Sequence, residues 1–384
     1  MNIGVFFGSR SPEHDVSIIT GEFIISGLKK MGQVAVPVYL DRQGRWFLGK
    51  ELDKLSFFKD GGNLDKLKAY YLDLEKSQGK MVFKQKGMFG KEIVIDLAFP
   101  AFHGQNGEDG TIQGLFELCN LPYVGCDVAS SAISMDKVLT KEFYLAHNIE
   151  TTKFTSFSAH DFKNEKEKIL QKIAELKYPL FVKPARLGSS IGITKVKDEQ
   201  ELTNAIEVAL HYENKILVEE GVENLMDVTC AVLGNENLQA SVLQESVFNA
   251  ELFSYEDKYL EEGGAQLGNA EDKLKIPARL DENITKHTQD LAVKIFKLLG
   301  CSGTARVDFL YNKKSGVMYA NEINTLPGTL YHHLWKKSGV EFKELLKKLI
   351  ELAQEKYFEK QKLTSSFESK ILEQANSLKL HVKN

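Results

Sequence analysis

Residues 303–328 read GTARVDFLYNKKSGVMYANEINTLPG, two β-rich runs on either side of a turn signal, and this pattern predicts a β-hairpin. Side chains alternate between the two faces of a strand. Arg306 and Asp308 are therefore expected on one face of the first strand, and Glu322 and Asn324 on one face of the second. The hairpin is expected to present Arg, Asp, Glu and Asn together, with apolar side chains behind them.

Two interpretations of this polar face are open. Carboxylate and amide oxygens suit Mg²⁺, which commonly shares its coordination shell with substrate phosphates, and an Arg beside them can hold a phosphate or a developing anion. The alternative is a cross-strand salt bridge on an ordinary polar surface. The run Asn321-Glu-Ile-Asn-Thr325 directly before Pro327-Gly328 favours a site, because amide and carboxylate before a rigid turn make a poor strand end.

Length and composition limit the function classes. The chain has 384 residues, enough for two or three domains, and its 43% hydrophobic and 27% charged residues are typical of a soluble globular protein. A net charge of -4 gives no electrostatic case for nucleic-acid binding. The four cysteines are far apart and are expected to be reduced core residues. No signal peptide or long apolar run is present, so a cytoplasmic protein without a membrane partner is expected.

The N-terminal region predicts a βαβ unit, with a strand at 2–8, a helix to about residue 30 and a strand at 34–40. The polar turn between the first strand and the helix lies where open α/β sheets bind ligands. Glu13 in this turn either caps the helix or receives a ligand amine. Residues 43–90 are expected to elaborate this unit.

A buried strand at 93–99 then leads into a glycine-rich polar loop at 103–110 that opens a helix. Glycine permits close approach of the backbone to a ligand, and the exposed helix amides favour an anion. His103 and Glu108 in the same loop strengthen the prediction of a ligand site.

The middle of the chain predicts an amphipathic helix over about 131–143, whose lysines are expected to be solvated. Strands follow at 179–186 and 191–196, joined by a Gly-Ser-Ser turn. Lys183 lies inside the first of these apolar strands, where burial demands a partner, and a phosphate is a suitable one.

Further strands are expected at 215–222 and 227–234, and a loop around 253–259 is expected to form a lid. Phe342, Leu345, Leu346, Leu349 and Ala353 follow the spacing of a helix.

Several motifs occur in one order between residue 3 and about residue 340, and together they resemble the D-alanine–D-alanine ligases of the ATP-grasp superfamily. They are Gly8 with Ser11-Pro-Glu13-His14-Asp-Val-Ser17, His103-Gly-x-x-Gly-Glu108-Asp-Gly, Met135-Asp-Lys137, Lys183-Pro-x-Arg-x-Gly-Ser189-Ser-x-Gly, Tyr255-Glu-Asp-Lys258-Tyr259, and Arg306-x-Asp308 with Asn321-Glu322-Ile-Asn324-Thr-x-Pro-Gly328.

The resemblance implies a three-domain α/β ATP-grasp architecture with an N-terminal Rossmann-like (pre-ATP-grasp) domain. The expected boundaries are 1–126 for the N-terminal substrate domain, 127–220 for the central lid domain, 221–360 for the C-terminal catalytic domain, and 361–384 for a peripheral helix or tail.

The resemblance also implies roles for individual residues. ATP binding is expected at Lys137, Lys183, Glu219, Glu220, Val222 and Asp227, where Asp227 replaces the family's usual Glu. Metal binding is expected at Asp308, Glu322 and Asn324. The catalytic group is expected to be Glu13, Ser189 and Tyr259, which position the first D-alanine, with Arg306 and the Gly328 amide at the oxyanion; substrate contacts are expected at His103, Lys258 and Thr329.

The activity implied is that of an ADP-forming carbon–nitrogen ligase, which joins two D-alanines through an acylphosphate for peptidoglycan synthesis, and so serves cell-wall biogenesis and cell shape. ATP and two Mg²⁺ ions, or Mn²⁺, are the implied cofactors, and a homodimer is the implied assembly. The alternatives are a related ligase with another acceptor, such as D-serine, D-lactate or another amino acid, and a nucleotide-binding relative that has lost catalysis.

One departure from the family concerns the loop after Gly328, which is several residues shorter and lacks the Ser that usually anchors the acceptor carboxylate. Thr329 is the expected substitute because it follows Gly328 directly. The Tyr331 hydroxyl, the imidazoles of His332 and His333, backbone amides and water are the other candidates.

Overall fold

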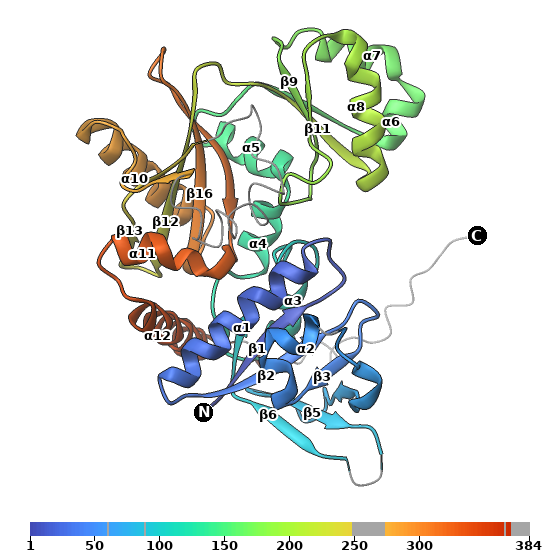
Figure 1. The fold of residues 1–384 in the computed structure, drawn as a ribbon, viewed down its shortest axis with the longest axis vertical. Helices are drawn as coiled ribbons and strands as arrows, with labels where there is room; N and C mark the ends of the chain where they lie inside the picture. The colour runs from blue at the N-terminus through green and yellow to red at the C-terminus, as the bar shows by residue number, and fades with distance from the viewer. Residues whose placement is uncertain (60, 88–89, 248–272, 365, 370–384) are drawn as a thin grey trace.

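The computed structural model describes residues 1–59, 61–87, 90–247, 273–364 and 366–369. Within these residues three β-sheets follow one another along the chain (Figure 1). The first has seven strands, the second has four and the third has six. Each sheet carries part of the candidate site described below.

The first sheet confirms the predicted βαβ unit. Strands β1 (Asn2–Gly8) and β2 (Val34–Leu40) are parallel, and helix α1 (His14–Lys30) connects them. The sheet order is β6-β5-β4-β3-β2-β1-β7. The added elements are β3 (Trp46–Leu48), η1 (Lys50–Asp53), α2 (Leu55–Lys59), η2 (Leu64–Lys66), β4 (Tyr70–Leu72), β5 (Met81–Gln85), β6 (Glu92–Ile95) and β7 (Leu97–Pro100).

The predicted single strand at 93–99 is divided at Asp96. Before this residue β6 pairs with β5, and after it β7 pairs with β1. The Asn2 N–H donates to Asp96 Oδ2 at 2.6 Å, and the Asp96 N–H donates to Asn2 O at 2.9 Å. These bonds hold the turn by which the chain leaves one neighbouring strand and joins the other.

The second sheet has the order β10-β9-β11-β8, and its neighbouring strands are antiparallel. Its strands are β8 (Phe154–Ser158), β9 (Leu180–Pro184), β10 (Thr194–Val196) and β11 (Lys215–Glu220). Its helices are α6 (Ala159–Asn164), α7 (Lys166–Ile173) and α8 (Glu199–Tyr212), which lie together beside the sheet in Figure 1. The predicted strand pair around the Gly-Ser-Ser turn is confirmed as β9 and β10.

Three helices connect the first two sheets: α3 (Thr111–Leu118), α4 (Val128–Met135) and α5 (Lys137–Ala146). The predicted single helix over 131–143 is wrong, because α4 ends and α5 begins at Asp136. The Asp136 carboxylate accepts hydrogen bonds from the amides of Val138 and Leu139 at 3.1 Å each, which caps the second helix.

The third sheet confirms the predicted hairpin as β16 (Gly303–Asn312) and β17 (Met318–Asn324). The sheet order is β15-β14-β12-β16-β17, with β13 beside β12. The remaining elements are β12 (Leu225–Gly234), β13 (Gln239–Ala240), β14 (Gln244–Ser246), β15 (Leu274–Lys275), α10 (Glu282–Leu298), η6 (Gly328–Tyr331), α11 (His332–Lys337) and α12 (Phe342–Gln361).

The faces of the hairpin are divided as predicted. Arg306 lies opposite Asn324 and Asp308 opposite Glu322, with a bulge after Asp308. The intervening Val307, Phe309 and Ile323 are buried in the core of the third sheet.

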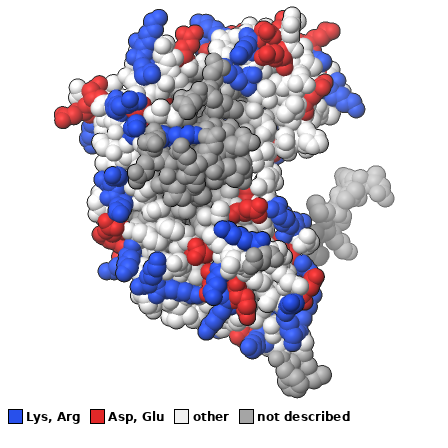
Figure 2. All heavy atoms as spheres, viewed as in Figure 1, with Lys and Arg blue, Asp and Glu red and all other residues white. Residues whose placement is uncertain are grey.

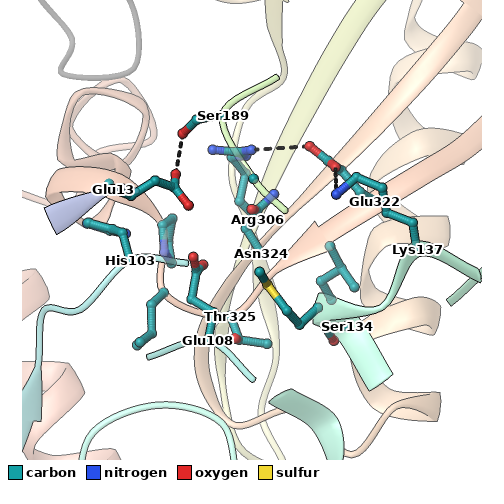
Figure 3. A pocket seen from close by; sticks show the side chains of 16 residues that line it. Glu13, His103, Glu108, Ser134, Lys137, Ser189, Arg306, Glu322, Asn324 and Thr325 are labelled. Atoms are coloured by element: carbon teal, nitrogen blue, oxygen red, sulfur yellow. Dashed lines mark hydrogen bonds and ion pairs between the residues drawn. The ribbon is translucent and has the colours of Figure 1, made fainter. Parts of the chain in front are cut away.

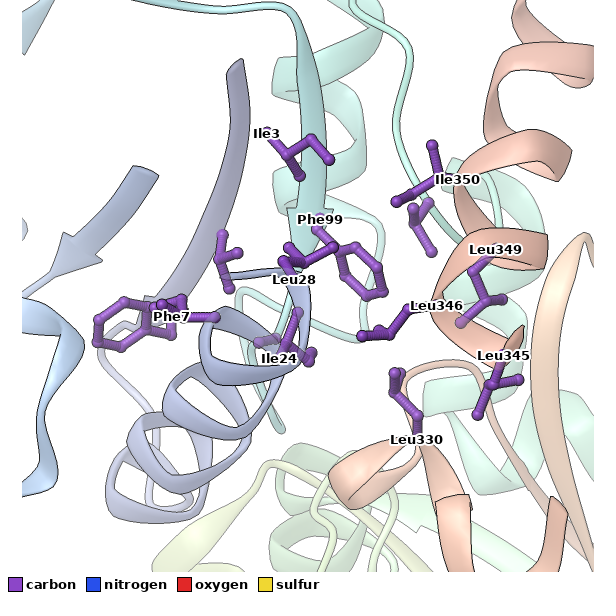
Figure 4. Packing of buried hydrophobic residues seen from close by; sticks show 14 of the residues in the cluster. Ile3, Phe7, Ile24, Leu28, Phe99, Leu330, Leu345, Leu346, Leu349 and Ile350 are labelled. Atoms are coloured by element: carbon purple, nitrogen blue, oxygen red, sulfur yellow. The ribbon is translucent and has the colours of Figure 1, made fainter. Parts of the chain in front are cut away.

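The helix predicted from the apolar spacing is confirmed as α12, and the first sheet shares its core with this helix. Ile3, Phe7 and Phe99 belong to one buried cluster with Leu345, Leu346 and Leu349 (Figure 4). Gly27 on α1 permits this approach, because a Cβ there would lie 2.5 Å from the Phe342 ring. Leu330 and Tyr331, which follow the hairpin, belong to the same cluster. The predicted domain boundaries stay a prediction, and residues 370–384 of the predicted tail lie outside the described part.

No helix in the described residues is long and apolar enough to cross a membrane. On the face shown in Figure 2, basic and acidic side chains are interspersed among uncharged ones.

Candidate active site

Two adjoining cavities lie where the three sheets meet. The larger, with an empty volume of about 2240 Å³, is lined mainly by the second and third sheets. The smaller is lined by loops of the first sheet, by the end of α4, by the turn at Gly188 and Ser189 and by the end of the hairpin. Five residues line both cavities: Lys137, Gly188, Ser189, Arg306 and Glu322. The two cavities therefore form one continuous candidate site.

The hairpin supplies the junction between the cavities. Arg306 Nε donates to Asp308 Oδ1 and Oδ2 at 2.9 Å each, and Arg306 Nη2 donates to Oδ2 at 2.5 Å. Asn324 Nδ2 donates to Asp308 Oδ2 at 3.2 Å. Arg306 Nη2 lies 3.9 Å from Glu322 Oε1, and Lys137 Nζ lies 3.7 Å from Glu322 Oε2 (Figure 3).

The donor set of this face fits a hard divalent cation. Asp308 and Glu322 occupy opposed positions of the hairpin, both line the larger cavity, and Asn324 adds an amide oxygen. Oxygen ligands that are too few to enclose an ion suit Mg²⁺, which completes its shell with water and substrate phosphates. In this structure the carboxylates are paired with Arg306 and Lys137, so the predicted metal role stays a prediction.

The lysines predicted to bind ATP enter the larger cavity from α5 and β9. Lys137 Nζ donates to Leu187 O at 2.5 Å, and Lys183 pairs with the carboxylate of Glu219. Burial raises the pKa of Glu219, but Lys141 and Lys183 outweigh burial and lower it below its usual range. Lys183 thus has a protein partner besides the phosphate that its burial suggested.

The residues predicted to bind the adenine and ribose also line this cavity. They are Glu219, Glu220, Val222 and Asp227, around the end of β11 and the start of β12. The Glu219 side chain is engaged by two lysines, so its contribution to an adenine edge would come from the backbone. Lys258 and Tyr259 lie outside the described residues.

Glu13 and Ser189 meet in the smaller cavity, as the resemblance implied. The Ser189 hydroxyl donates to Glu13 Oε1, although the two residues are 176 positions apart in the chain (Figure 3). Glu13 precedes α1 but its side chain makes no capping hydrogen bond. The role of Glu13 as a ligand contact stays a prediction.

His103 and Glu108 lie deeper in the same cavity, and burial determines their protonation. Burial, with Arg306 nearby, lowers the pKa of His103 to about 4. Burial, followed by repulsion from Glu13, raises the pKa of Glu108 to about 8, although the Gly104 amide donates to Glu108 at 2.7 Å. Burial thus disfavours the charged form of both side chains.

The segment after Gly328 has an unusual backbone. Thr329, Leu330 and Tyr331 have φ values of 47°, 58° and 51°, a region that L-residues occupy only when their surroundings enforce it. Among the described residues no hydrogen-bond partner of Thr329 Oγ1 is present, although this atom is buried.

Two of the other candidate donors of this segment are engaged, whereas Nδ1 of His332 and Nδ1 of His333, like Thr329 Oγ1, have no hydrogen-bond partner among the described residues. The Tyr331 hydroxyl is hydrogen-bonded to Gln244, and its ring lies over the Arg306 guanidinium at 4.9 Å. His333 Nε2 lies 2.8 Å from Gln244 Oε1. The role of Thr329 as the substitute for the missing Ser stays a prediction.

Sequence reasoning missed Lys141 and Gln244. Lys141 was expected to be solvated but is buried, and its position one helical turn after Lys137 was the available signal. Gln244 lies on a three-residue strand, where no local pattern distinguishes it.

Comparison with known proteins agrees with this geometry. Two family models match the chain, "D-ala D-ala ligase N-terminus" over residues 2–126 and "D-ala D-ala ligase C-terminus" over residues 143–351. The chain belongs to the D-alanine–D-alanine ligase family.

Curated relatives support the assignment along nearly the whole chain. The D-alanine–D-alanine ligase of Thermosipho melanesiensis is 39% identical and aligns over 97% of this chain and 98% of its own. That of Thermoanaerobacter sp. is 40% identical over 93% of this chain and 98% of its own.

Solved structures of the family are similar in fold. The D-alanine–D-alanine ligase of Coxiella burnetii has a TM-score of 0.78 and 31% identity, and the alignment covers 94% of this chain and 96% of the other. The VanG D-Ala:D-Ser ligase of Enterococcus faecalis has a TM-score of 0.77 and 35% identity, with 92% and 99% covered.

Proposed function

We propose that this protein is an ATP-dependent D-alanine–D-alanine ligase that supplies D-alanyl-D-alanine for peptidoglycan synthesis. The observation that carries the proposal is the junction of the two cavities at Arg306 and Glu322. A nucleotide in the larger cavity and an amino acid in the smaller one would meet at this junction, between the Glu13–Ser189 pair and Lys137 (Figure 3).

The reaction would have two steps. A carboxylate oxygen of the first D-alanine attacks the γ-phosphorus of ATP, the bond to the β,γ-bridging oxygen breaks, and ADP leaves. The amine of the second D-alanine then attacks the acylphosphate carbon. Phosphate leaves with the oxygen that came from the carboxylate, and the attacking nitrogen loses its proton. No protein nucleophile takes part, so positioning and electrostatics account for catalysis.

The residues divide between the two ends of the site. Lys137 and Lys183 would hold ATP phosphates, Glu219 to Val222 would contact the adenine, and Asp227 the ribose. Asp308, Glu322 and Asn324 would hold two Mg²⁺ ions, or Mn²⁺, which when bound neutralise the charge that develops on the transferred phosphoryl group. Glu13, Ser189 and His103 would position the first D-alanine, with Tyr259 and Lys258 contributed from outside the described residues.

Arg306 and the Gly328 amide would stabilise the oxyanion of the tetrahedral intermediate. Arg306 is suited to this role because Asp308 and the Tyr331 ring fix its guanidinium at the junction. The Thr329 hydroxyl would receive the carboxylate of the acceptor.

D-Alanine is the proposed acceptor, and D-serine is the second candidate because the structural neighbour VanG is a D-Ala:D-Ser ligase. A nucleotide-binding relative without catalysis is not favoured, since Arg306, Asp308, Glu322 and Asn324 are all present on one face. We further propose action in the cytoplasm, where ATP is found, and a homodimer, which light scattering would detect as twice the chain mass of 43.3 kDa.

Product analysis tests the proposal. The protein is incubated with ATP, Mg²⁺ and D-alanine, alone and in competition with D-serine, D-lactate and L-alanine, and products are identified by mass. One D-alanyl-D-alanine per ADP is expected as the main product. A main product that contains D-serine or D-lactate would overturn the acceptor assignment, and ADP release without condensation would overturn the ligase assignment.

A further inference from the structure

Lys141 is a buried cation that the reaction described above does not use. It lies on α5 with 1% of its surface exposed. Its ammonium donates to Thr151 Oγ1 at 2.8 Å and Thr152 Oγ1 at 2.8 Å, and it lies 2.6 Å from Glu219 Oε2. Three acceptors match the three N–H donors of a charged ammonium.

The two threonines donate their own hydroxyl protons to other acceptors, and this supports the protonated form of Lys141. The Thr152 hydroxyl donates to Glu219 Oε2 at 2.6 Å, and the Thr151 hydroxyl donates to Ala320 O at 2.8 Å. Both hydroxyl protons are thus used elsewhere, so each threonine oxygen can only accept from Lys141. The second bond also ties the ammonium to β17, the strand that carries Glu322.

Glu219 is shared between two lysines. Its Oε2 contacts Lys141 and its Oε1 contacts Lys183, whose side chain enters the larger cavity. One carboxylate opposite two ammonium groups leaves a net charge of +1. Without Lys141 the carboxylate would belong to Lys183 alone, and the net charge of the cluster would be zero.

We propose that Lys141 is a positioning residue for the triphosphate: by balancing Glu219 it leaves Lys183 with a positive charge for phosphate. The inference rests on the proposed function, because it takes ATP as the ligand of the larger cavity. A lysine that merely stabilises the fold would not affect ATP binding through its charge. The proposal therefore requires the dissociation constant for ATP to change with the net charge of the Lys141–Glu219–Lys183 cluster. Coulomb interactions are strong in such a partly desolvated site, so one unit of charge has a measurable effect.

The test measures dissociation constants for Mg-ATP and for adenosine by calorimetry, in wild type, Lys141→Met, Glu219→Gln and the double variant. In Lys141→Met the dissociation constant for ATP should rise on the order of tenfold, whereas that for adenosine should stay within about twofold. The double variant restores the net charge of +1 and should recover most of the loss. The Glu219→Gln variant, with a charge of +2, should bind ATP no more weakly than the double variant.

Thr151→Val is the matched control, since it removes a hydrogen bond from the same ammonium without changing charge. It should lower the thermal midpoint but leave the ATP constant within about twofold. An ATP constant in Lys141→Met equal to wild type, a double variant as weak as Lys141→Met, or a Thr151→Val variant equally weak would each overturn the proposal.

If Lys141→Met does not fold, the double variant alone tests the proposal. The double variant contains no unpaired buried carboxylate and is then compared directly with wild type. A constant for ATP more than about tenfold above wild type would overturn the proposal. Failure of the wild-type protein to bind ATP would instead contradict the proposed function, so the two failures are distinguishable.

Discussion

Glu219 and Glu108 are both buried carboxyl groups of the candidate site, but their surroundings shift their pKa values in opposite directions. Glu219 lies between Lys141 and Lys183, which lower its pKa despite burial. For Glu108, burial and repulsion from Glu13 outweigh the attraction of Arg306 and raise its pKa to about 8. Burial alone therefore does not determine charge; the partner groups do.

The difference matches the two ligands proposed for the site. A nucleoside triphosphate brings several negative charges. The end of the site that contains Glu219 has two lysines, Lys141 and Lys183, whose combined charge exceeds that of Glu219. An amino acid brings one ammonium and one carboxylate. At the other end burial disfavours the charged forms of Glu108 and His103. Glu13 is there to receive the ammonium, and Arg306 lies in the same cavity to receive the carboxylate.

The largest effect on activity is expected from neutralising the Glu322 carboxylate, which lies on the hairpin at the phosphate end of the site. Glu322→Gln keeps the shape of the side chain but removes one anionic ligand of the proposed metal site. We expect kcat to fall on the order of 10³-fold, because metal ions supply several kcal/mol of charge stabilisation. Steady-state ADP release measures the effect, and unchanged thermal stability shows that the fold is intact.

Glu344→Gln is the matched control for this change, because Glu344 lies on the surface of α12, 3.5 Å from Lys348. Its activity should equal that of the wild type. Undiminished turnover in Glu322→Gln would contradict the metal role proposed for Glu322.

A smaller effect is expected at the acceptor segment. Thr329→Val replaces by a methyl group the hydroxyl that has no partner among the described residues. It should raise the KM for the second D-alanine about tenfold, the effect of one hydrogen bond to a charged group. The KM for ATP should stay nearly constant. Initial rates over a D-alanine series separate the two constants.

Tyr331→Phe provides the comparison, because its hydroxyl already bonds to Gln244 and its ring on Arg306 is kept. We expect little change in the acceptor constant. If Thr329→Val and Tyr331→Phe both leave that constant unaltered, neither hydroxyl holds the acceptor carboxylate, and the two histidines, the backbone amides and water are left as its partners.

The smallest effects concern the pH dependence of stability, and they differ in sign. Glu108 has a folded pKa of about 8 above its ordinary value of 4.5, so its contribution to the unfolding free energy is present below pH 4.5 and is lost as the pH rises to about 8. Glu219 has a lowered pKa, so its contribution is present above pH 4.5 and is lost as the pH falls.

Denaturant unfolding of Glu108→Gln and Glu219→Gln against wild type checks this comparison. The advantage of wild type over Glu108→Gln should shrink between pH 4.5 and 8, and its advantage over Glu219→Gln should shrink below pH 4.5. If the stability difference from wild type changed with pH in the same direction in both variants, the two glutamates would not differ in the sign of their pKa shifts.

The hairpin was predictable from sequence because its signal is local. Strand periodicity alone assigned Arg306, Asp308 and Glu322 to one polar face. The division of one helix at Asp136 was also encoded locally, since Asp is a favoured N-cap, but the lysines of an apparently continuous amphipathic run concealed it.

The buried charges were not predictable, because they depend on contacts between distant segments. Lys141 and Glu219 are 78 positions apart and lie on different elements, so no spacing pattern identifies them as a pair. The same holds for the backbone of Thr329 to Tyr331. Positive φ values in three successive non-glycine residues reflect tertiary packing, not local preference.

The most direct test of the account is whether an oxygen passes from the amino-acid end of the site to the phosphate end. D-Alanine labelled with ¹⁸O in both carboxylate oxygens is converted with unlabelled ATP, and inorganic phosphate is analysed by mass. One phosphate is expected for each D-alanyl-D-alanine formed, and each phosphate should contain one ¹⁸O. Phosphate without label, accompanied by dipeptide, would contradict an acylphosphate formed at the junction of the two cavities.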